Sequence, residues 1–391
     1  MIDTARARAD TPGCTQVIHF HHSGAALMPA PVLTAVKQHL DLEASIGGYE
    51  AAEQAVDKIE NTYHAIARLL NCSPDEIAVV ENATVAWDMA FYGLAQAFRP
   101  GDRLLTVMAE YASNYIALLQ VARHTGVKIE VVPNDIYGQL DVQALERMLD
   151  ERVRLISVTH VPTNGGLVNP AAAVGRVARK YGIPYLLDAC QSAGQMPLDV
   201  EALGCDMLSA TGRKFLRGPR GTGFLYVRRS LLESIEPPFL DLHSACWTGP
   251  DSYQIRADAR RFESWESCLA AKIGLGVAID YALSWGLDDI YKYIQVLADA
   301  LRRRLSELPG VTVRDLGKEK CGIVTFTHTR RRPAEIRTAL ARQRINVGLS
   351  QRSATLLDME DRGLPELVRC PVHYYNTEDE LERLLEALAA L

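Results

Sequence analysis

Short apolar runs alternate with amphipathic segments between about residues 77 and 227. Apolar runs rich in β-branched and aliphatic residues predict strands, and apolar positions that recur at helical spacing predict helices. We expect strands at 77–80, 104–107, 129–132, 155–158, 185–187 and 223–227, and helices at 84–97, 113–125, 142–150 and 170–181. Because strand and helix alternate, the pattern predicts an α/β fold with a mainly parallel, doubly wound sheet that helices cover on both faces.

The pattern changes after about residue 287. Here it predicts a helix at 290–308, a strand at 321–327, a helix at 333–343, a short strand at 345–347 and a closing helix at 377–391. We therefore expect two domains, an N-terminal segment with a large domain at 1–286 and a smaller α+β domain at 287–391, joined by a helix at 268–285. The three arginines at 330–332 precede a proline and are expected in a solvated turn.

Composition narrows the class of protein. The chain has 391 residues, 48% hydrophobic and 23% charged, which is typical of a globular protein with a sizeable core. Its formal charge of −6 gives no bulk attraction to nucleic acid or anionic lipid. No run approaches the ~18 apolar residues of a membrane span, and no apolar targeting segment follows the start. We expect a cytoplasmic protein with neither nucleic-acid nor membrane partners.

Cysteine and histidine spacing adds two expectations. The eight cysteines are never arranged as CxxC, so they are expected to be reduced thiols rather than a disulfide framework. His19, His21 and His22 share no useful spacing with Cys, Asp or Glu, so no metal site is expected.

Polar side chains with a shared chemistry follow two of the predicted strands. Asp188 comes where the apolar run 185–187 ends, and Gln191 follows three positions later. Lys214 lies in the sequence Thr211-Gly-Arg-Lys, within a glycine-rich segment before the strand at 223–227. Taken singly, Asp188 is typical of a turn or cap and Lys214 of a surface residue. Together they point to a ligand at the carboxyl ends of a parallel sheet.

Pyridoxal phosphate is the ligand that needs this combination. It requires a lysine for covalent attachment, a carboxylate that keeps the ring nitrogen protonated, and phosphate donors at the start of a helix. The donors are expected at Ala83 and Thr84, where a strand gives way to a helix and the helix dipole favours an anion. Thr84 alone would also fit a simple helix N-cap.

At these motifs the chain resembles the class V, fold-type I pyridoxal-phosphate enzymes. The family includes cysteine desulfurases, selenocysteine lyases, cysteine-conjugate C–S lyases, isopenicillin N epimerase and kynureninase, and the resemblance runs from about residue 18 to the C-terminus. It implies a Schiff base on Lys214, a pyridinium partner in Asp188, a ligand of the ring hydroxyl in Gln191, and phosphate ligands in Thr84 and Thr211.

The same resemblance assigns further residues near the cofactor. Tyr111 matches the aromatic residue over the ring, in place of the histidine common in desulfurases. Thr163 occupies the position of an asparagine near the phenolic oxygen, although Asn164 is an alternative. Arg213 replaces a histidine that helps to hold the phosphate and keeps a positive charge there.

On the substrate side, the resemblance implies an amino-acid substrate. Arg369 is expected to grip its α-carboxylate, since a guanidinium matches a carboxylate with two donors. Ala25 and Ala26 are expected to line the pocket. A homodimer with its site at the subunit interface is also implied, with a phosphate contact from the partner's segment 260–267, where Trp265 and Ser267 are candidates and Glu266 would repel phosphate.

One departure from the family limits the reaction. Desulfurases carry a nucleophilic cysteine in the loop after the short strand that is here 345–347, and residues 348–354 contain none. Persulfide chemistry would then need Cys370 or another thiol. Because Tyr111, Arg213 and residues 374–377 resemble the lyase and epimerase branch of the family, we favour a C–S lyase. It would act by β-elimination on an S-conjugated cysteine or cysteine sulfoxide, with Lys214 taking the α-proton.

Other reactions stay open on the same scaffold. They are amino-acid epimerisation, in which Tyr111 would supply a proton on the opposite face, decarboxylation-dependent oxidative deamination, and transamination. A desulfurase, and a protein that binds the cofactor without turnover, are less favoured. The sequence leaves the substrate side chain open, although Arg352 is one candidate contact for an anionic or zwitterionic distal group.

Overall fold

The computed structural model describes residues 2–391, which form three sheets with helices packed around them. The largest sheet has seven strands, and their spatial order is β2 (Ile77–Val80), β8 (Gly223–Val227), β7 (Met207–Thr211), β6 (Tyr185–Asp188), β5 (Val153–Thr159), β3 (Arg103–Val107) and β4 (Lys128–Val132). Strand β8 runs antiparallel to both of its neighbours, β2 and β7, and the other adjacent strands pair in parallel. The expected mainly parallel sheet is confirmed.

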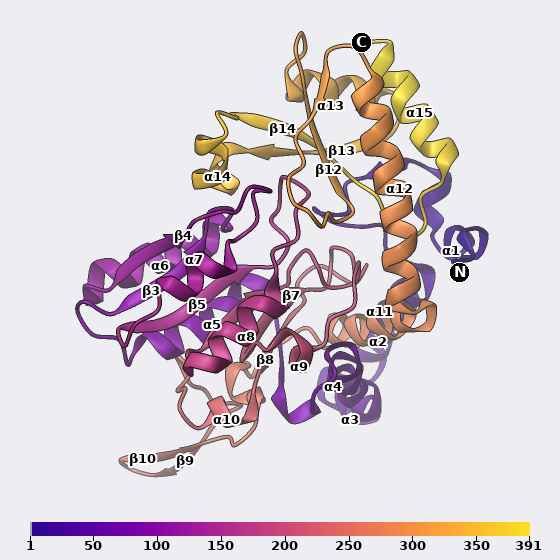
Figure 1. The fold of residues 1–391 in the computed structure, drawn as a ribbon. Coiled ribbons are helices and arrows are strands. Elements are labelled where there is room, and N and C mark those ends of the chain that lie inside the picture. Colours follow the sequence, from indigo (N-terminus) through magenta and orange to yellow (C-terminus); the bar gives the residue numbers. More distant parts are fainter. Residues whose placement is uncertain (1) are drawn as a thin grey trace.

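Helices cover both faces of this sheet (Figure 1). Adjacent strand residues point to opposite faces, so Leu187 packs in the core that includes α4, α8 and α11, whereas Leu186 packs in the core beneath α5 and α6. The helices of this part are α2 (Ala30–Ile46), α3 (Gly48–Gln54), α4 (Val56–Leu70), α5 (Ala83–Ala95), α6 (Ala112–Thr125), α7 (Val142–Arg147), α8 (Ala171–Tyr181), α9 (Val200–Leu203), α10 (Arg229–Leu232) and α11 (Leu269–Trp285).

A second sheet of five strands lies at the top of Figure 1, with α12 running along its side. Its spatial order is β1 (Ile18–Phe20), β13 (Ile345–Gln351), β14 (Glu366–Pro371), β12 (Ile323–His328) and β11 (Val311–Val313). The associated helices are α1 (Thr4–Ala9), α12 (Leu287–Glu307), α13 (Pro333–Arg342), α14 (Leu356–Asp361) and α15 (Glu378–Ala389). Because β1 pairs with β13 in parallel, the N-terminal segment completes the sheet of the C-terminal part. The domain boundary after residue 286 stays a prediction.

The structure corrects the sequence-based elements at three places. Residues 207–211 form the interior strand β7 and residues 366–371 form β14, and the sequence pattern predicted neither strand. Both strands carry polar or charged side chains that interrupt the apolar pattern. The strand expected at 345–347 continues to Gln351, so the segment expected to be a loop begins as a strand. The three arginines at 330–332 do lie in an exposed turn before α13, as predicted.

A two-stranded hairpin, β9 (Ala245–Gly249) and β10 (Ser252–Ile255), projects from the lower end of the molecule in Figure 1. Short 3-10 turns lie at Pro12–Thr15, Pro74–Glu76, Ala259–Phe262 and Arg352–Ala354. Among the residues that the structure describes, no helix is both long and apolar enough to cross a membrane.

Candidate active site

A cavity of about 410 Å³ lies at the carboxyl ends of β5, β6 and β7. In addition to Asn82, Val85, Asn114, Thr159, Val161 and Cys190, the residues that line it are those predicted to bind the cofactor: Ala83, Thr84, Tyr111, Thr163, Asp188, Gln191, Thr211, Arg213 and Lys214. The fold therefore brings together side chains that are spread over more than a hundred positions of sequence, as expected for the ligand edge of a parallel sheet.

Asp188 ends β6 with its carboxylate buried and held in place. One oxygen accepts a hydrogen bond from the Asn114 side chain at 2.9 Å, and the other accepts from the backbone N–H of Cys190 at 2.8 Å. Burial raises the pKa of Asp188, and these hydrogen bonds and the nearby Lys214 ammonium oppose that rise. A carboxylate that is oriented and poorly hydrated in this way is suited to a cationic partner such as a protonated ring nitrogen.

Glu110 is a second buried acid behind Asp188, and the sequence did not single it out. It accepts hydrogen bonds from the hydroxyl groups of Thr106 at 2.7 Å and Thr159 at 2.5 Å, and from Asn114 at 2.9 Å. Burial raises the pKa of Glu110 to about 7, with the charge of Asp188 adding to the rise. Asn114 donates to both acids and so fixes their relative positions. The only sequence signal was an acid that follows the buried strand β3.

Lys214 projects into the cavity and is only 8% exposed. Its Nζ donates to the Sγ of Cys190 at 3.1 Å. Burial raises the pKa of the Cys190 thiol, and the lysine opposes that rise. Cys190 was not predicted as a site residue, although it lies in the motif between Asp188 and Gln191. In the described part of the chain, the Cys190 thiol is the one hydrogen-bond partner of this buried amine, so the amine is available to condense with a carbonyl group.

The start of α5 forms one end of the cavity. Asn82, not Thr84, is the N-cap, because its side chain accepts from the backbone N–H of Val85 at 3.0 Å. Within residues 2–391, the Thr84 hydroxyl has no hydrogen-bond partner, so it and the free N–H groups of the first turn can serve an anion. At Gly223, a Cβ would lie 2.5 Å from the carbonyl carbon of Asn82, so only glycine lets β8 approach the cap. The Thr211 hydroxyl donates to the Thr222 carbonyl at 3.2 Å.

Thr163 lines the cavity and accepts hydrogen bonds from both Arg369 and Gln191. Arg369, on β14, donates from Nη1 to the Thr163 carbonyl at 2.9 Å and to its hydroxyl. Gln191 donates to the same hydroxyl at 3.3 Å and to the Ser23 carbonyl at 3.2 Å. Asn164 instead bonds to Asp358 and Thr355, away from the cavity. Of the two neighbours considered from sequence, only Thr163 lines the cavity.

Ala25, Ala26 and Arg369 lie beside the cavity and are not among its lining residues. The N–H of Ala26 donates to the Arg213 carbonyl at 2.9 Å, and Arg213 Nη1 donates to the carbonyl of Gly24. Arg369 is connected to the cavity through Thr163. Their roles toward a substrate stay predictions.

Arg217, three residues after Lys214, forms the centre of a second cluster that the sequence did not reveal. The backbone N–H of Arg217 donates to the Lys214 carbonyl at 3.0 Å, and the residue has a left-handed φ of 62°. The guanidinium is buried and donates to the Leu27 carbonyl at 2.9 Å, to the Tyr374 hydroxyl at 2.8 Å and to the Thr11 hydroxyl.

Aromatic rings surround this guanidinium. The rings of Tyr375, Tyr374 and Tyr281 have their centroids 4.3, 5.1 and 5.7 Å from its Cζ, which is cation–π geometry. We call these four residues, with the neighbouring His22 and His373, the arginine–tyrosine cluster. It joins the lysine loop to both ends of the chain.

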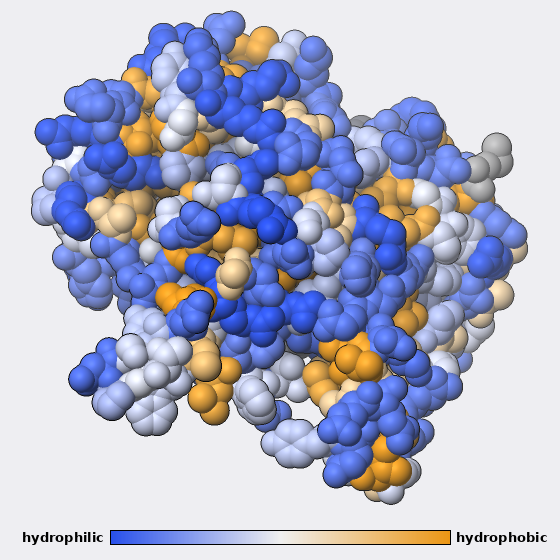
Figure 2. All heavy atoms as spheres, turned by 90° about the horizontal axis from the view of Figure 1, so that it is seen from below, coloured by the Kyte–Doolittle hydropathy of each residue, from blue (hydrophilic) through white to orange (hydrophobic). Residues whose placement is uncertain are grey.

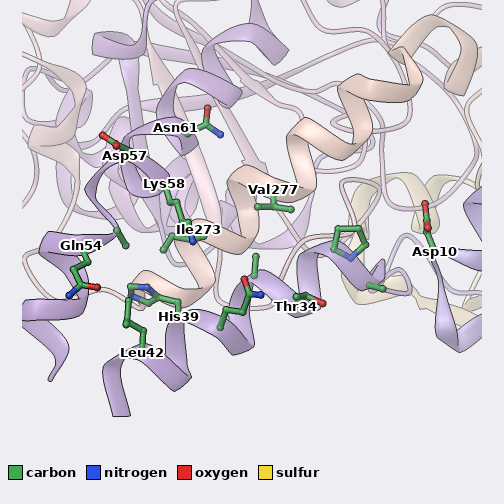
Figure 3. A pocket seen from close by; sticks show the side chains of 15 residues that line it. Asp10, Thr34, His39, Leu42, Gln54, Asp57, Lys58, Asn61, Ile273 and Val277 are labelled. Carbon is green, nitrogen blue, oxygen red and sulfur yellow. The ribbon is translucent and has the colours of Figure 1, made fainter. Parts of the chain in front are cut away.

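A larger cavity of about 920 Å³ lies between α2, α4 and α11 (Figure 3). The figure shows His39 and Leu42 on α2 facing Lys58 on α4 and Ile273 on α11. None of the predicted site residues lines it. Size alone therefore does not identify the functional cavity, whereas convergent ionisable groups do.

The residues of the smaller cavity fit pyridoxal phosphate. Lys214 offers an amine, Asp188 a carboxylate for the ring nitrogen, and the first turn of α5 offers phosphate donors. In addition, the Oε1 of Gln191 is buried without a hydrogen-bond partner in the described part of the chain, so it can accept from a ring hydroxyl.

The fold and this cavity define a fold-type I pyridoxal-phosphate protein. The family model described as aminotransferase class-V matches residues 18–384, and the chain belongs to this family. The predicted family and the predicted cofactor, pyridoxal 5′-phosphate, are thereby confirmed.

Individual relatives agree with this family. A probable cysteine desulfurase of Methanothermobacter thermautotrophicus is 30% identical over 98% of this chain and 97% of its own length. The apo structure of a cysteine desulfurase from Thermococcus onnurineus NA1 superposes with a TM-score of 0.93, at 26% identity, over 100% of this chain and 98% of that one. The cystine C–S lyase C-DES, in complex with its product cysteine persulfide, has a TM-score of 0.86 at 26% identity, over 97% of this chain and 99% of that one.

Proposed function

We propose that the protein is a pyridoxal-phosphate-dependent lyase that cleaves the Cβ–S bond of an S-conjugated cysteine or cysteine sulfoxide. The observation that carries the proposal is the absence of a cysteine from the segment in which desulfurases carry their nucleophilic thiol. The segment from β13 to Ala354 has serines at 350 and 353 and no cysteine. Cys370 is fully buried in β14, where burial raises its pKa. Neither position supplies a reactive thiolate, so elimination is favoured over sulfur transfer to the protein.

In the proposed reaction, Lys214, Asp188 and Arg369 each have a separate role. When bound, the cofactor withdraws electrons from the Cα of the amino acid. Lys214 then takes the α-proton, and the sulfur leaves Cβ with the electron pair of the broken bond. Asp188 keeps the ring nitrogen protonated throughout. Arg369 orients the α-carboxylate, and the products after hydrolysis are a thiol or its oxidised form, pyruvate and ammonia.

A cysteine desulfurase is the second candidate, and the names of the relatives favour it. That reaction needs a protein thiol to accept sulfur. Cys190 lines the cavity beside Lys214, so it is the thiol to test for this role. Epimerisation stays a further alternative, because Tyr111 lies at the mouth of the cavity, is 37% exposed and could move a proton there.

We further propose a homodimer. Several large side chains are exposed at one end of the large domain, among them Trp247, which is 74% exposed, and Phe239, Leu242, Tyr253 and Trp265. Figure 2 shows hydrophobic patches separated by hydrophilic residues on the face that includes this end. A cavity of about 820 Å³ here is lined by Trp265, Ser267 and Glu81, and Glu81 directly precedes Asn82, the N-cap of α5. A second copy seated here would lie close to the phosphate end of the site.

One screen tests the reaction. The purified protein, loaded with cofactor, is given cysteine S-conjugates, their sulfoxides and free cysteine, and pyruvate, sulfide, alanine and chirality are followed. Pyruvate from the conjugates supports the lyase, and alanine with protein-bound sulfur from cysteine supports the desulfurase instead. The Lys214→Ala variant serves as the control, and pyruvate formation that survives in this variant would contradict the assignment of the base.

A further inference from the structure

We propose that Arg213 binds a second anionic group of the substrate, so that the preferred substrate is a cysteine conjugate whose sulfur substituent carries a carboxylate. This inference rests on the proposed function and names its substrate class. Arg369 would bind the α-carboxylate, and Arg213 the distal one.

The first observation is that neither arginine is neutralised by the protein. Within residues 2–391, neither Arg213 nor Arg369 forms an ion pair, whereas the buried Arg302 contacts Asp315 at 2.7 Å. Arg369 is 8% exposed, and its Nε has no hydrogen-bond partner. Arg213 donates only from Nη1, to the Gly24 carbonyl. Both guanidiniums therefore keep spare donors beside the cavity.

The second observation is that the two charges are close enough to affect each other. The pKa of Arg369 is lowered to about 10, chiefly by burial; Tyr111 opposes this shift, and the Arg213 guanidinium contributes to it. Two like charges that share a partly dry site repel each other. An anion between or beside them would remove that repulsion, which makes the pair a prepared anion site rather than a structural ion pair.

The third observation concerns the ring of His21, which lies near Arg369 and near the loop that Arg213 contacts. A Cβ at Gly348 would lie 2.8 Å from the His21 ring and 3.3 Å from the Nε of Arg369. A Cβ at Gly24, whose carbonyl accepts from Arg213, would lie 2.5 Å from the same ring. Burial lowers the pKa of His21 to about 4, so the ring is neutral at pH 7 and adds a hydrogen-bonding group without a third positive charge.

The Arg213 side chain lines the cavity and also reaches the N-terminal loop. Its Nη1 donates to the Gly24 carbonyl, next to Ala25 and Ala26 on the predicted substrate side. Arg352, the other candidate for a distal anion, is a poorer choice. Its side chain is 58% exposed and already lies 3.7 Å from Glu360.

The experiment compares two nearly isosteric substrates, S-carboxymethylcysteine and its neutral amide S-carbamoylmethylcysteine. Wild-type holoenzyme, Arg213→Gln, Arg213→Lys and the control Arg352→Gln are each assayed for KM, kcat and the dissociation constant of the cofactor. We expect wild type and Arg352→Gln to prefer the acid by tenfold or more in kcat/KM, through KM, as loss of one charge-assisted hydrogen bond implies. Arg213→Gln should lose this preference and keep its cofactor affinity within about threefold, and Arg213→Lys should regain part of it.

Two results would overturn the inference. One is a wild-type enzyme without preference for the acid. The other is an Arg213→Gln variant that keeps the preference and binds cofactor tenfold more weakly, which would assign Arg213 to the phosphate. Calorimetric titration of both compounds into the holo Lys214→Ala protein measures the preference without turnover. A binding preference without any pyruvate from wild type would therefore count against the proposed reaction and leave the anion site standing.

Discussion

The cofactor cavity and the arginine–tyrosine cluster both contain arginine side chains close to Lys214. They differ in how many of the guanidinium donors already have an acceptor in the protein. In the cluster, the Nε, Nη1 and Nη2 atoms of Arg217 each donate to an acceptor, and three tyrosine rings surround the guanidinium. At the cavity, by contrast, the Nε of Arg369 and the Oε1 of Gln191 are buried and have no hydrogen-bond partner among residues 2–391. A satisfied buried charge holds segments together, whereas an unsatisfied one is available to a ligand. The two arginines therefore differ in whether their donors are already used by the protein.

The largest effect should come from Lys214 at the centre of the cavity. Lys214→Ala removes both the covalent attachment and the proposed base, so turnover should fall by about a thousandfold or more. Borohydride reduction followed by peptide mapping should label Lys214 in wild type. Labelling of a different lysine would break the assignment of this cavity.

Removing the charge at the centre of the arginine–tyrosine cluster should lower the stability of the protein. Arg217→Met leaves the acceptors of Thr11, Leu27 and Tyr374 without their donor, so the free energy of unfolding should fall by about 3 kcal/mol. Urea unfolding of the cofactor-free protein measures this change. Unchanged stability would show that the cluster does not connect the lysine loop to the chain ends.

Acidification should weaken the same cluster. His22 bonds to Asn376 and Tyr375, and His373 bonds to the Phe215 carbonyl. Burial holds the pKa of both histidines well below 6.5. The unfolded chain therefore binds protons that the folded chain does not, and stability is lost as pH falls below 6.5. At pH 5.5 each histidine should cost about 1.4 kcal/mol.

Urea unfolding between pH 7.5 and 5 checks the sign of this effect. The variant His22→Gln should show a shallower decline than wild type. A steeper decline, or stability that rises on acidification, would contradict the neutral state of these rings.

The smallest change in stability should follow substitution beside the cavity. Arg369→Gln removes a buried charge that has no ion-pair partner, so the unfolding free energy of the cofactor-free protein should change by less than about 1 kcal/mol. Its KM for amino acids should nevertheless rise tenfold or more. Differential scanning calorimetry and steady-state kinetics on the same preparation test the two parts. A large loss of stability would place Arg369 with Arg217 as a structural residue.

Sequence patterns predicted the elements in which burial dominates. The apolar runs of β2 and β8 were located to the residue, because one continuous buried run allows few alternatives. Strands β7 and β14 were not predicted because Ser209, Thr211 and Arg369 interrupt their apolar character. Of these three residues, Thr211 lines the cavity, so a polar residue at the site also weakens the strand signal of β7.

The site was predictable where a motif carried its chemistry along the chain, as with Asp188 and Lys214. It was not predictable where function depends on approach in space. Glu110 is an isolated acid in the sequence, and its importance comes from Asn114, which bonds it to Asp188. Cys190 likewise matters through its contact with Lys214, and Arg217 through its contacts with Thr11 and Tyr374. No local sequence pattern predicts these contacts.

The pairing of β1 with β13 has a consequence for how the protein is made. Strand β1 is translated before every strand of the large sheet, and its parallel partner β13 after all of them. The large sheet can therefore form on the nascent chain while β1, and the loop after it that meets Arg213, still lack the strand that holds them in place. Chains truncated before β13 should then fold their large sheet without fixing this loop beside the cavity.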